Sequence, residues 1–134
     1  LARKLDIGIA IIDKRRPSPG KSQVMNVIGN VKKKTCIIID DIIDSGGTIV
    51  NAAEALISRG AKEVYVYITH GVLSGEAVEK IKKSRIKKLV ITDTIDNSNK
   101  LKNVKNIEVL SISNLLGEAI KRISNSTSVS DLFK

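Results

Sequence analysis

The sequence has very few aromatic residues and a single cysteine. Its 134 residues include no Trp, one Phe, two Tyr and one Cys. A protein that recognises nucleic-acid bases by stacking needs aromatic platforms, so this composition argues against that mode of recognition. The lone Cys36 excludes an internal disulfide and a zinc site built from several cysteines. It favours a reducing, cytoplasmic setting.

Long apolar runs are also absent. No stretch approaches the roughly 20 apolar residues of a membrane span, and no signal peptide precedes the first predicted element. Hydrophobic residues make up 42% of the chain, which suits one soluble domain over residues 1–134. The first residue is Leu1 rather than Met. We therefore expect a piece of a longer protein.

Positive charge exceeds negative charge, with 23 Lys and Arg against 14 Asp and Glu and a net charge of +9. Such an excess attracts anions, including nucleic acid. The lysines, however, form small groups beside predicted strands and helices, where solvated lysines ordinarily lie. The composition favours a solvated surface that attracts phosphorylated small molecules. Binding of a larger polyanion stays open as the alternative.

Short runs of β-branched residues alternate with helical patterns along the chain. The runs occupy residues 7–12, 36–40, 64–69, 89–92 and 107–110. Continuous apolar runs are typical of strands covered on both faces. Helical spacing recurs over residues 49–56, 76–83 and 116–123. This order predicts an α/β fold, with a parallel, doubly wound sheet of about five strands flanked by helices.

One segment interrupts this alternation. Residues 14–24 contain both prolines, Pro17 and Pro19, with Gly20 beside them. Such residues favour turns and prevent regular pairing, so we expect an exposed, flexible loop.

The clearest chemical signal is the turn between the second run and the first helix. Gly46 and Gly47 have no Cβ, so backbone amides there approach an anion closely. The helix that follows directs its N-terminal amides towards the same point. Ser45 and Thr48 add hydroxyl donors. These residues predict a phosphate site at the carboxyl end of a parallel strand, where α/β folds bind ligands.

Two carboxylates immediately precede this turn. Asp40 and Asp41 would repel a phosphate unless they accept hydrogen bonds or hold a cation. Sugar hydroxyls and Mg²⁺ are their natural partners. The combination predicts a sugar phosphate that is handled with magnesium.

Several segments resemble the ribose-phosphate pyrophosphokinase family, whose halves have the type I phosphoribosyltransferase fold. Residues 40–48 (DDIIDSGGT) resemble the phosphoribosyl pyrophosphate (PRPP) loop of that fold, and residues 11–17 (IIDKRRP) resemble the family's catalytic loop. Residues 24–31, 69–75 and 128–133 resemble further family segments, so the resemblance extends over nearly the whole chain. It indicates the C-terminal half of such an enzyme.

The resemblance implies a reaction and a set of roles. The β,γ-diphosphoryl group of ATP would move to the C1 hydroxyl of ribose 5-phosphate, with Mg²⁺ as cofactor. Lys14 and Arg16, in the catalytic loop of residues 14–24, would stabilise the migrating group. Asp40 and Asp41 would also contact Mg²⁺. The residues implied in binding ribose 5-phosphate are Asp40, Asp41, Asp44, Ser45, Gly46, Gly47 and Thr48.

Three further expectations complete the resemblance. Ser128, Val129 and Ser130 would contribute to a regulatory phosphate site, the alternative being an ordinary terminal segment. The full-length protein would be a homo-oligomer in the cytoplasm, without a membrane or nucleic-acid partner. His70 follows a predicted strand and would line the nucleotide side of the site, unless its role is structural.

Two other functions stay open on the sequence. A phosphoribosyltransferase that consumes PRPP would use the same loop, although no segment after Thr94 resembles a base-binding hood. A non-catalytic regulatory subunit that senses PRPP would not need Lys14 and Arg16, and it would bind RNA through its lysines.

Overall fold

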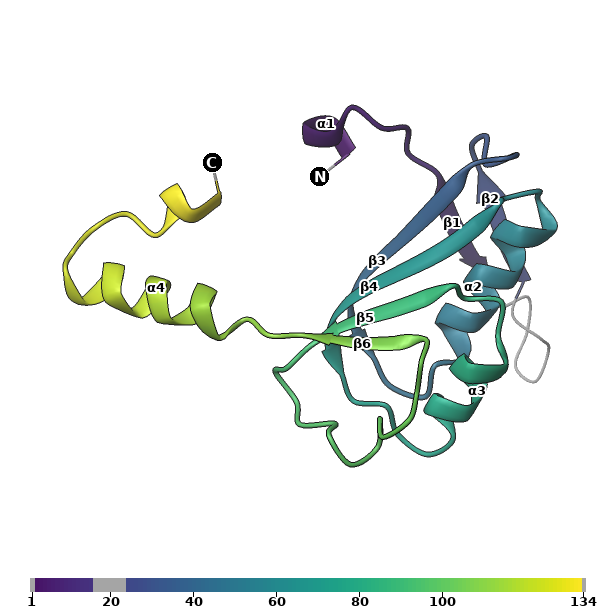
Figure 1. Cartoon of the computed structure of the whole chain (residues 1–134). Helices are drawn as coiled ribbons and strands as arrows, with labels where there is room; N and C mark the ends of the chain where they lie inside the picture. The colour runs from purple at the N-terminus through teal and green to yellow at the C-terminus, as the bar shows by residue number, and fades with distance from the viewer. Residues whose placement is uncertain (1, 16–23, 134) are drawn as a thin grey trace.

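The computed structural model describes residues 2–15 and 24–133, and its centre is a parallel sheet of four strands (Figure 1). The strand order is the chain order, β3-β4-β5-β6, and each neighbouring pair is parallel. The strands are β3 (Thr35–Ile43), β4 (Glu63–Gly71), β5 (Lys88–Thr92) and β6 (Ile107–Leu110). The α/β class and the parallel sheet expected from the alternation are confirmed.

Two helices cover one face of this sheet. The helix α2 (Gly47–Ser58) connects β3 to β4, and α3 (Ala77–Lys83) connects β4 to β5. Alternate residues of β4 point towards them, so that Val64, Val66 and Ile68 are buried. From α2 the buried residues are Ile49, Ala52, Ala53 and Leu56, which share one face at helical spacing. This layer is the hydrophobic core.

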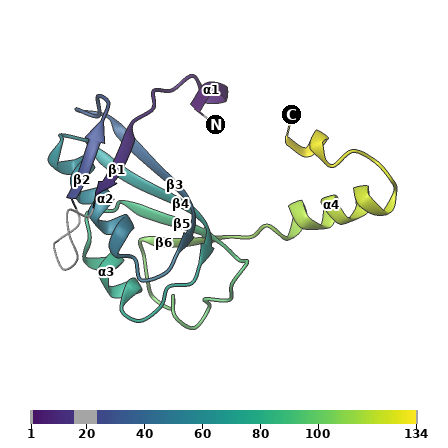
Figure 2. The same ribbon diagram turned by 180° about the vertical axis from the view of Figure 1, so that it is seen from behind.

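The opposite face of the sheet differs from the expectation of cover on both sides. Ile37 and Ile39 of β3 are 48% and 56% exposed, and Tyr67 beside them on β4 is 43% exposed. Both views show α2 and α3 against one face, whereas α1, α4 and the C-terminal helix stand away from the sheet on the other side (Figures 1 and 2). Among the described residues, this face of the sheet is therefore left open.

The first expected strand also takes a different place. Residues 7–10 are not in a strand, and β1 (Ile11–Arg15) pairs with β2 (Val24–Ile28) in an antiparallel hairpin instead of joining the sheet. The expected flexible loop of residues 14–24 is therefore shorter than predicted at both ends, because Lys14 and Val24 are paired strand residues. The rest of that loop lies outside the described residues.

The two ends of the chain form an arm beside the sheet. The helix α4 (Ser113–Ser124) leaves the carboxyl end of β6 and has no buried residue. After α4 the chain turns back to the short helix η1 (Ser130–Phe133) (Figure 1). There the carbonyl of Phe133 accepts a hydrogen bond from Lys4 Nζ of the short helix α1 (Ala2–Leu5) at 2.6 Å. None of the helices in the described part of the chain has the length and apolar character needed to cross a membrane.

Candidate functional site

The candidate phosphate loop, residues 44–48, joins the carboxyl end of β3 to the start of α2. Gly46 is the N-cap of α2 and has a φ of 75°, in the left-handed region that favours glycine. An added Cβ at Gly46 would lie 3.6–3.7 Å from Ala77 of α3, so the two helices meet at this turn. The loop thus lies at the strand edge where parallel α/β sheets bind ligands.

The amides of this loop are available to a ligand. Within the described residues, the backbone N–H groups of Ser45, Gly46 and Gly47 donate to no backbone carbonyl. The first amides of any helix lack intrahelical acceptors, and the helix dipole makes the same end positive. A Cβ built on Gly47 would meet nothing within 4 Å. The structure therefore leaves open space beside Gly47, at a helix start whose first amides have no backbone acceptor.

The two predicted acids lie in the last part of β3. Asp40 Oδ1 accepts a hydrogen bond from the amide of Asp41 at 3.0 Å, and both residues are exposed. Adjacent residues of a strand point to opposite faces, so these carboxylates are directed to different sides of the sheet. Asp40 is in register with the buried Ile68 and lines the cavity beside α2. Asp40 and Asp41 are thus not brought together.

The metal expectation is limited by this arrangement. In residues 2–15 and 24–133, no group of three or more His, Cys, Asp and Glu side chains could hold a metal ion. Mg²⁺ commonly uses only one or two carboxylates together with substrate oxygens. Either Asp40 or Asp41 singly fits that pattern, but a cage formed by both is not present.

A cavity of about 950 Å³ lies between residues 7–12, β3 and α2. Of the predicted site residues, only Asp40 and Thr48 line it. The rest of its wall is largely apolar, with isoleucines from all three segments. An apolar groove is a poor match for a charged sugar phosphate, so the loop with its free amides is the better candidate for the phosphate.

The remaining predicted residues fall into two groups. Lys14 belongs to β1, but its side chain is not among those described, and Arg16 lies outside the described residues. Ser128, Val129 and Ser130 are on the arm beyond α4, away from the phosphate loop in both views (Figures 1 and 2).

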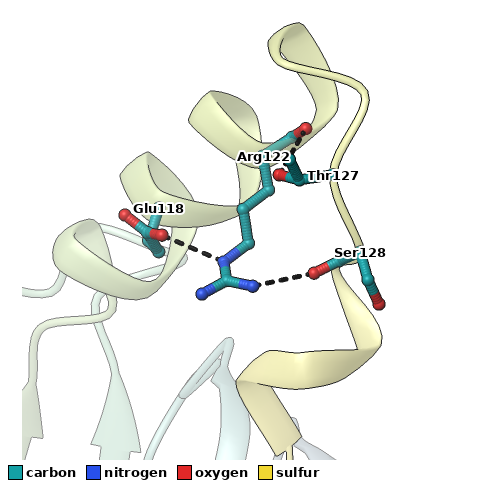
Figure 3. A network of polar contacts seen from close by, with 4 residues as sticks. All are labelled: Glu118, Arg122, Thr127 and Ser128. Carbon is teal, nitrogen blue, oxygen red and sulfur yellow. Dashed lines mark hydrogen bonds and ion pairs between the residues drawn. The ribbon is translucent and has the colours of Figure 1, made fainter.

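Arg122 fixes the start of that tail (Figure 3). Its Nε donates to Glu118 Oε1 at 2.9 Å, and its Nη1 donates to the carbonyl of Ser128 at 2.9 Å. The hydroxyl of Thr127 donates back to the Arg122 carbonyl at 3.2 Å. The tail is therefore folded back on α4.

Polar side chains at the carboxyl ends of β4 and β5 form a second group. Nδ1 of His70 lies 2.9 Å from Oγ1 of Thr94, and the Thr92 hydroxyl donates to the carbonyl of Thr69 at 2.6 Å. The sequence pattern indicated His70 but not the threonines. Hydroxyls at the end of an otherwise apolar run, as in residues 89–94, were the available signal.

Asp93 contacts the short segment that connects β6 to α4. Its carboxylate accepts hydrogen bonds from the Ser111 hydroxyl and from the Ile112 amide, the latter at 3.0 Å. These bonds, that of Ser111 first, lower the pKa of the Asp93 carboxyl, since both favour its charged form. The direction in which α4 leaves the sheet is thus fixed by specific contacts.

The fold is an α/β domain with a parallel sheet, and its glycine turn lies at the carboxyl end of the first parallel strand. The family model that matches, over residues 2–134, is described as the phosphoribosyl synthetase-associated domain. The chain belongs to that family.

Two curated relatives and one solved structure show how similar this chain is to other proteins. The ribose-phosphate pyrophosphokinase of Brucella melitensis is 57% identical over 133 residues, and that of Hyphomonas neptunium is 59% identical over 134 residues. Each match covers 99% of this chain. The crystal structure of phosphoribosylpyrophosphate synthetase from Mycobacterium smegmatis has 36% identity and a TM-score of 0.82, covering 93% of this chain.

The relatives are longer than this chain. The chain spans 43% of the length of the two curated relatives and 40% of the solved one. These matches do not support the narrower expectation that the chain is the C-terminal half of such an enzyme.

Proposed function

We propose that this chain binds ribose 5-phosphate as part of a ribose-phosphate pyrophosphokinase. That enzyme transfers the β,γ-diphosphoryl group of ATP to the C1 hydroxyl of the sugar, giving PRPP and AMP. The observation that carries the proposal is the turn of Ser45, Gly46 and Gly47, whose amides are free at the carboxyl end of β3. Its support is membership of the family and the identity to the curated pyrophosphokinases.

The phosphate loop would bind the 5-phosphate of the sugar. Its amides and the hydroxyls of Ser45 and Thr48 are donors, and hydrogen bonds to a charged acceptor are the strong ones. The carboxylate of Asp44 lies on the same turn, within reach of a ribose hydroxyl. The phosphate thereby fixes the position of the sugar ring.

Asp40 and Asp41 would accept hydrogen bonds from the ribose hydroxyls. One of them would also hold Mg²⁺ with oxygens of the substrates, and the cation would supply charge neutralisation at the diphosphoryl group. Lys14 and Arg16 would add positive charge around the migrating group, since such transfer depends on electrostatic stabilisation more than on covalent chemistry.

Two expectations about the whole protein remain part of this proposal. The complete protein would be a homo-oligomer in the cytoplasm, with ATP as the second substrate. Ser128, Val129 and Ser130 would contribute hydroxyls and amides to a regulatory phosphate site, and Arg122 gives their segment a fixed start.

Calorimetry with ribose 5-phosphate tests the binding site. Gly47→Val should leave the fold intact, because a Cβ there meets nothing within 4 Å. The branched side chain would occupy the space of the phosphate and remove two or more charge-assisted hydrogen bonds. Affinity should fall by roughly 100-fold or more, at about 1.5–3 kcal/mol for each such bond.

Gly117→Ala is the matched control, since Gly117 also faces open space but lies on the remote helix α4. Its affinity should equal that of the unchanged chain. A folded Gly47→Val chain with unchanged affinity would refute the loop assignment. Tight binding of free ribose would also refute the assignment, because binding would then not depend on the phosphate.

The isolated chain should bind the sugar phosphate but show no turnover. It spans less than half of the curated relatives' length, and we assign the adenine contacts to the remainder. Bringing two substrates together supplies about 7–11 kcal/mol of acceleration in favourable cases. Incubation with ATP, Mg²⁺ and ribose 5-phosphate should therefore release no AMP. Sustained AMP release coupled to PRPP would mean that this chain contains a complete site.

A further inference from the structure

The segment that follows β4, residues 72–80, lies directly behind the phosphate loop and is called the brace here. Its backbone amides donate to carbonyls at the end of β3. The Val72 and Leu73 amides donate to the Ile43 carbonyl at 2.9 and 3.3 Å, and the Ser74 amide donates to the Asp44 carbonyl at 3.2 Å. The brace therefore holds the entry to the loop.

Lys80 continues this pattern with a side chain. Its Nζ donates to the carbonyl of Ser45 at 3.5 Å. Three successive carbonyls, those of Ile43, Asp44 and Ser45, thus accept donors from one segment. The hydrogen bond from Lys80 to Ser45 is the longest of these bonds, and it is the only one of them whose donor carries a charge.

This pattern decides where the loop amides point. The described chain has no cis peptide bond. In a planar trans peptide the C=O and the N–H point in opposite directions. When the carbonyls of Asp44 and Ser45 face the brace, the amides of Ser45 and Gly46 face away from it. Those two amides belong to the proposed phosphate cradle, so the brace sets its orientation.

The position of Lys80 relative to the loop is fixed by packing. Ala77, one helical turn earlier on α3, is fully buried. It packs close to Gly46, because a Cβ added at Gly46 would lie 3.7 Å from the Cβ of Ala77. Lys80 forms no ion pair with any carboxylate in the described part of the chain. Its charge is therefore not offset by an ion pair and lies behind the peptide that joins Ser45 to Gly46.

A cation at that carbonyl strengthens the opposite end of the same peptide. A hydrogen bond to the C=O polarises the peptide group and makes its N–H a better donor. The ammonium also adds positive potential to a site meant for a doubly charged phosphate, an effect that salt weakens.

We propose that Lys80 is a positioning residue for the phosphate cradle, which orients and polarises the Ser45–Gly46 peptide so that it binds a monophosphate ester. This inference rests on the proposed function and adds the residue that sets the affinity of its phosphate site. Lys80 acts through the backbone and not by touching the substrate.

Three variants of the full chain test it by calorimetry. Lys80→Met keeps the length of the side chain without its charge, and Lys80→Arg keeps the charge. Lys83→Met changes an exposed lysine of the same helix, which makes no hydrogen bond to the loop within the described residues. Affinity for ribose 5-phosphate should fall roughly tenfold in Lys80→Met, the scale of one charge-assisted hydrogen bond in an exposed setting. Lys83→Met and Lys80→Arg should stay within about threefold of the unchanged chain.

Salt dependence separates a charge effect from a structural one. The gap between the unchanged chain and Lys80→Met should narrow from low salt to 0.5 M NaCl, because screening removes the contribution of the ammonium. The melting temperature should be the same for both. A gap that is constant with salt, or an equal loss in Lys80→Arg, would overturn the inference.

The outcomes separate the positioning role of Lys80 from the proposed binding of ribose 5-phosphate. If the unchanged chain binds ribose 5-phosphate and Lys80→Met binds equally well, the positioning role is wrong and the proposed function stands. If the unchanged chain does not bind ribose 5-phosphate, the proposed function fails, and the role of Lys80 fails with it.

Discussion

Gly71 is the residue whose replacement has the most sharply defined consequence for stability. It ends β4, pairs with Ile43 and is buried. An added Cβ would lie 2.5 Å from Cδ1 of Ile91, 3.2 Å from its Cγ2 and 3.3 Å from its Cβ. Ile91 is fully buried on the neighbouring strand β5, so it has little room to move away.

The cost of Gly71→Ala follows from this crowding. Overpacking a well-filled core costs about 1–3 kcal/mol. Unfolding entropy of about 2.1 cal/mol/K per residue gives roughly 0.28 kcal/mol/K for a chain of 134 residues. The melting temperature should therefore fall by roughly 4–11 °C.

A double-mutant cycle identifies the cause. Ile91→Val removes the Cδ1 atom and alone should cost about 0.5–1.5 kcal/mol. Combined with Gly71→Ala it should be less destabilising than the sum of the two, because the Cβ then occupies the space of the lost methyl. Gly117→Ala is the control with the opposite sign, since a Cβ there meets open space inside a helix and should stabilise by about 0.5–1 kcal/mol.

Urea or thermal unfolding monitored by circular dichroism measures the unchanged chain and the four variants. Additive effects of Gly71→Ala and Ile91→Val would refute the crowding argument. So would a Gly71→Ala chain within about 0.5 kcal/mol of the unchanged one, the range of an ordinary surface substitution.

Three further predictions concern titration and the arm. Burial raises the pKa of the Cys36 thiol above its ordinary value, against a smaller lowering by Lys34. Its alkylation at pH 7 should therefore be slower than that of an exposed cysteine peptide, and the rate should level off at a higher pH than the peptide's. Equal rates and equal pH profiles would contradict this. The lowered pKa of Asp93 means that its contribution to stability is full above about pH 4 and is lost as pH falls further. Asp93→Asn should therefore lose less stability than the unchanged chain between pH 6 and pH 3, and equal losses would exclude this role. Arg122→Ala should expose the tail at Ser128 to proteolysis while changing stability by no more than about 1 kcal/mol, because the ion pair of Arg122 is solvent-accessible; unchanged proteolysis would show that Arg122 does not fix the tail.

The sequence predicted the βα units well because their signals are local. The β-branched runs at residues 36–40, 64–69, 89–92 and 107–110 all lie in β3, β4, β5 and β6. The glycine turn at Gly46 and Gly47 falls between β3 and α2, since only a glycine accommodates the left-handed backbone at Gly46 without strain.

The direction of α4 could not be predicted in the same way. The spacing of Leu116, Ile120 and Ile123 indicates an apolar helix face, and α4 includes all three. A helical repeat does not say what covers that face, and here these residues are 52–67% exposed. Asp93 sets the direction through two hydrogen bonds that no local repeat encodes.

In the candidate site, too, local features could be predicted from the sequence and long-range contacts could not. The residues of the loop itself were visible as a motif, but the contact from Lys80 to Ser45 crosses 35 positions and depends on how α3 packs on the turn. The opposite directions of Asp40 and Asp41 follow from their being in a strand that continues to Ile43. The predicted run ended at Asp40, so this could not be foreseen.

The central claim is that the turn after β3 binds the phosphate of ribose 5-phosphate, and backbone amide NMR tests it most directly. Titration of the ¹⁵N-labelled chain with ribose 5-phosphate should shift the amide signals of Ser45, Gly46 and Gly47 downfield, as these N–H groups become donors to a charged acceptor. Free ribose should leave them unchanged. Shifts confined to the apolar cavity between residues 7–12 and α2, or no shift at millimolar sugar phosphate, would contradict the account.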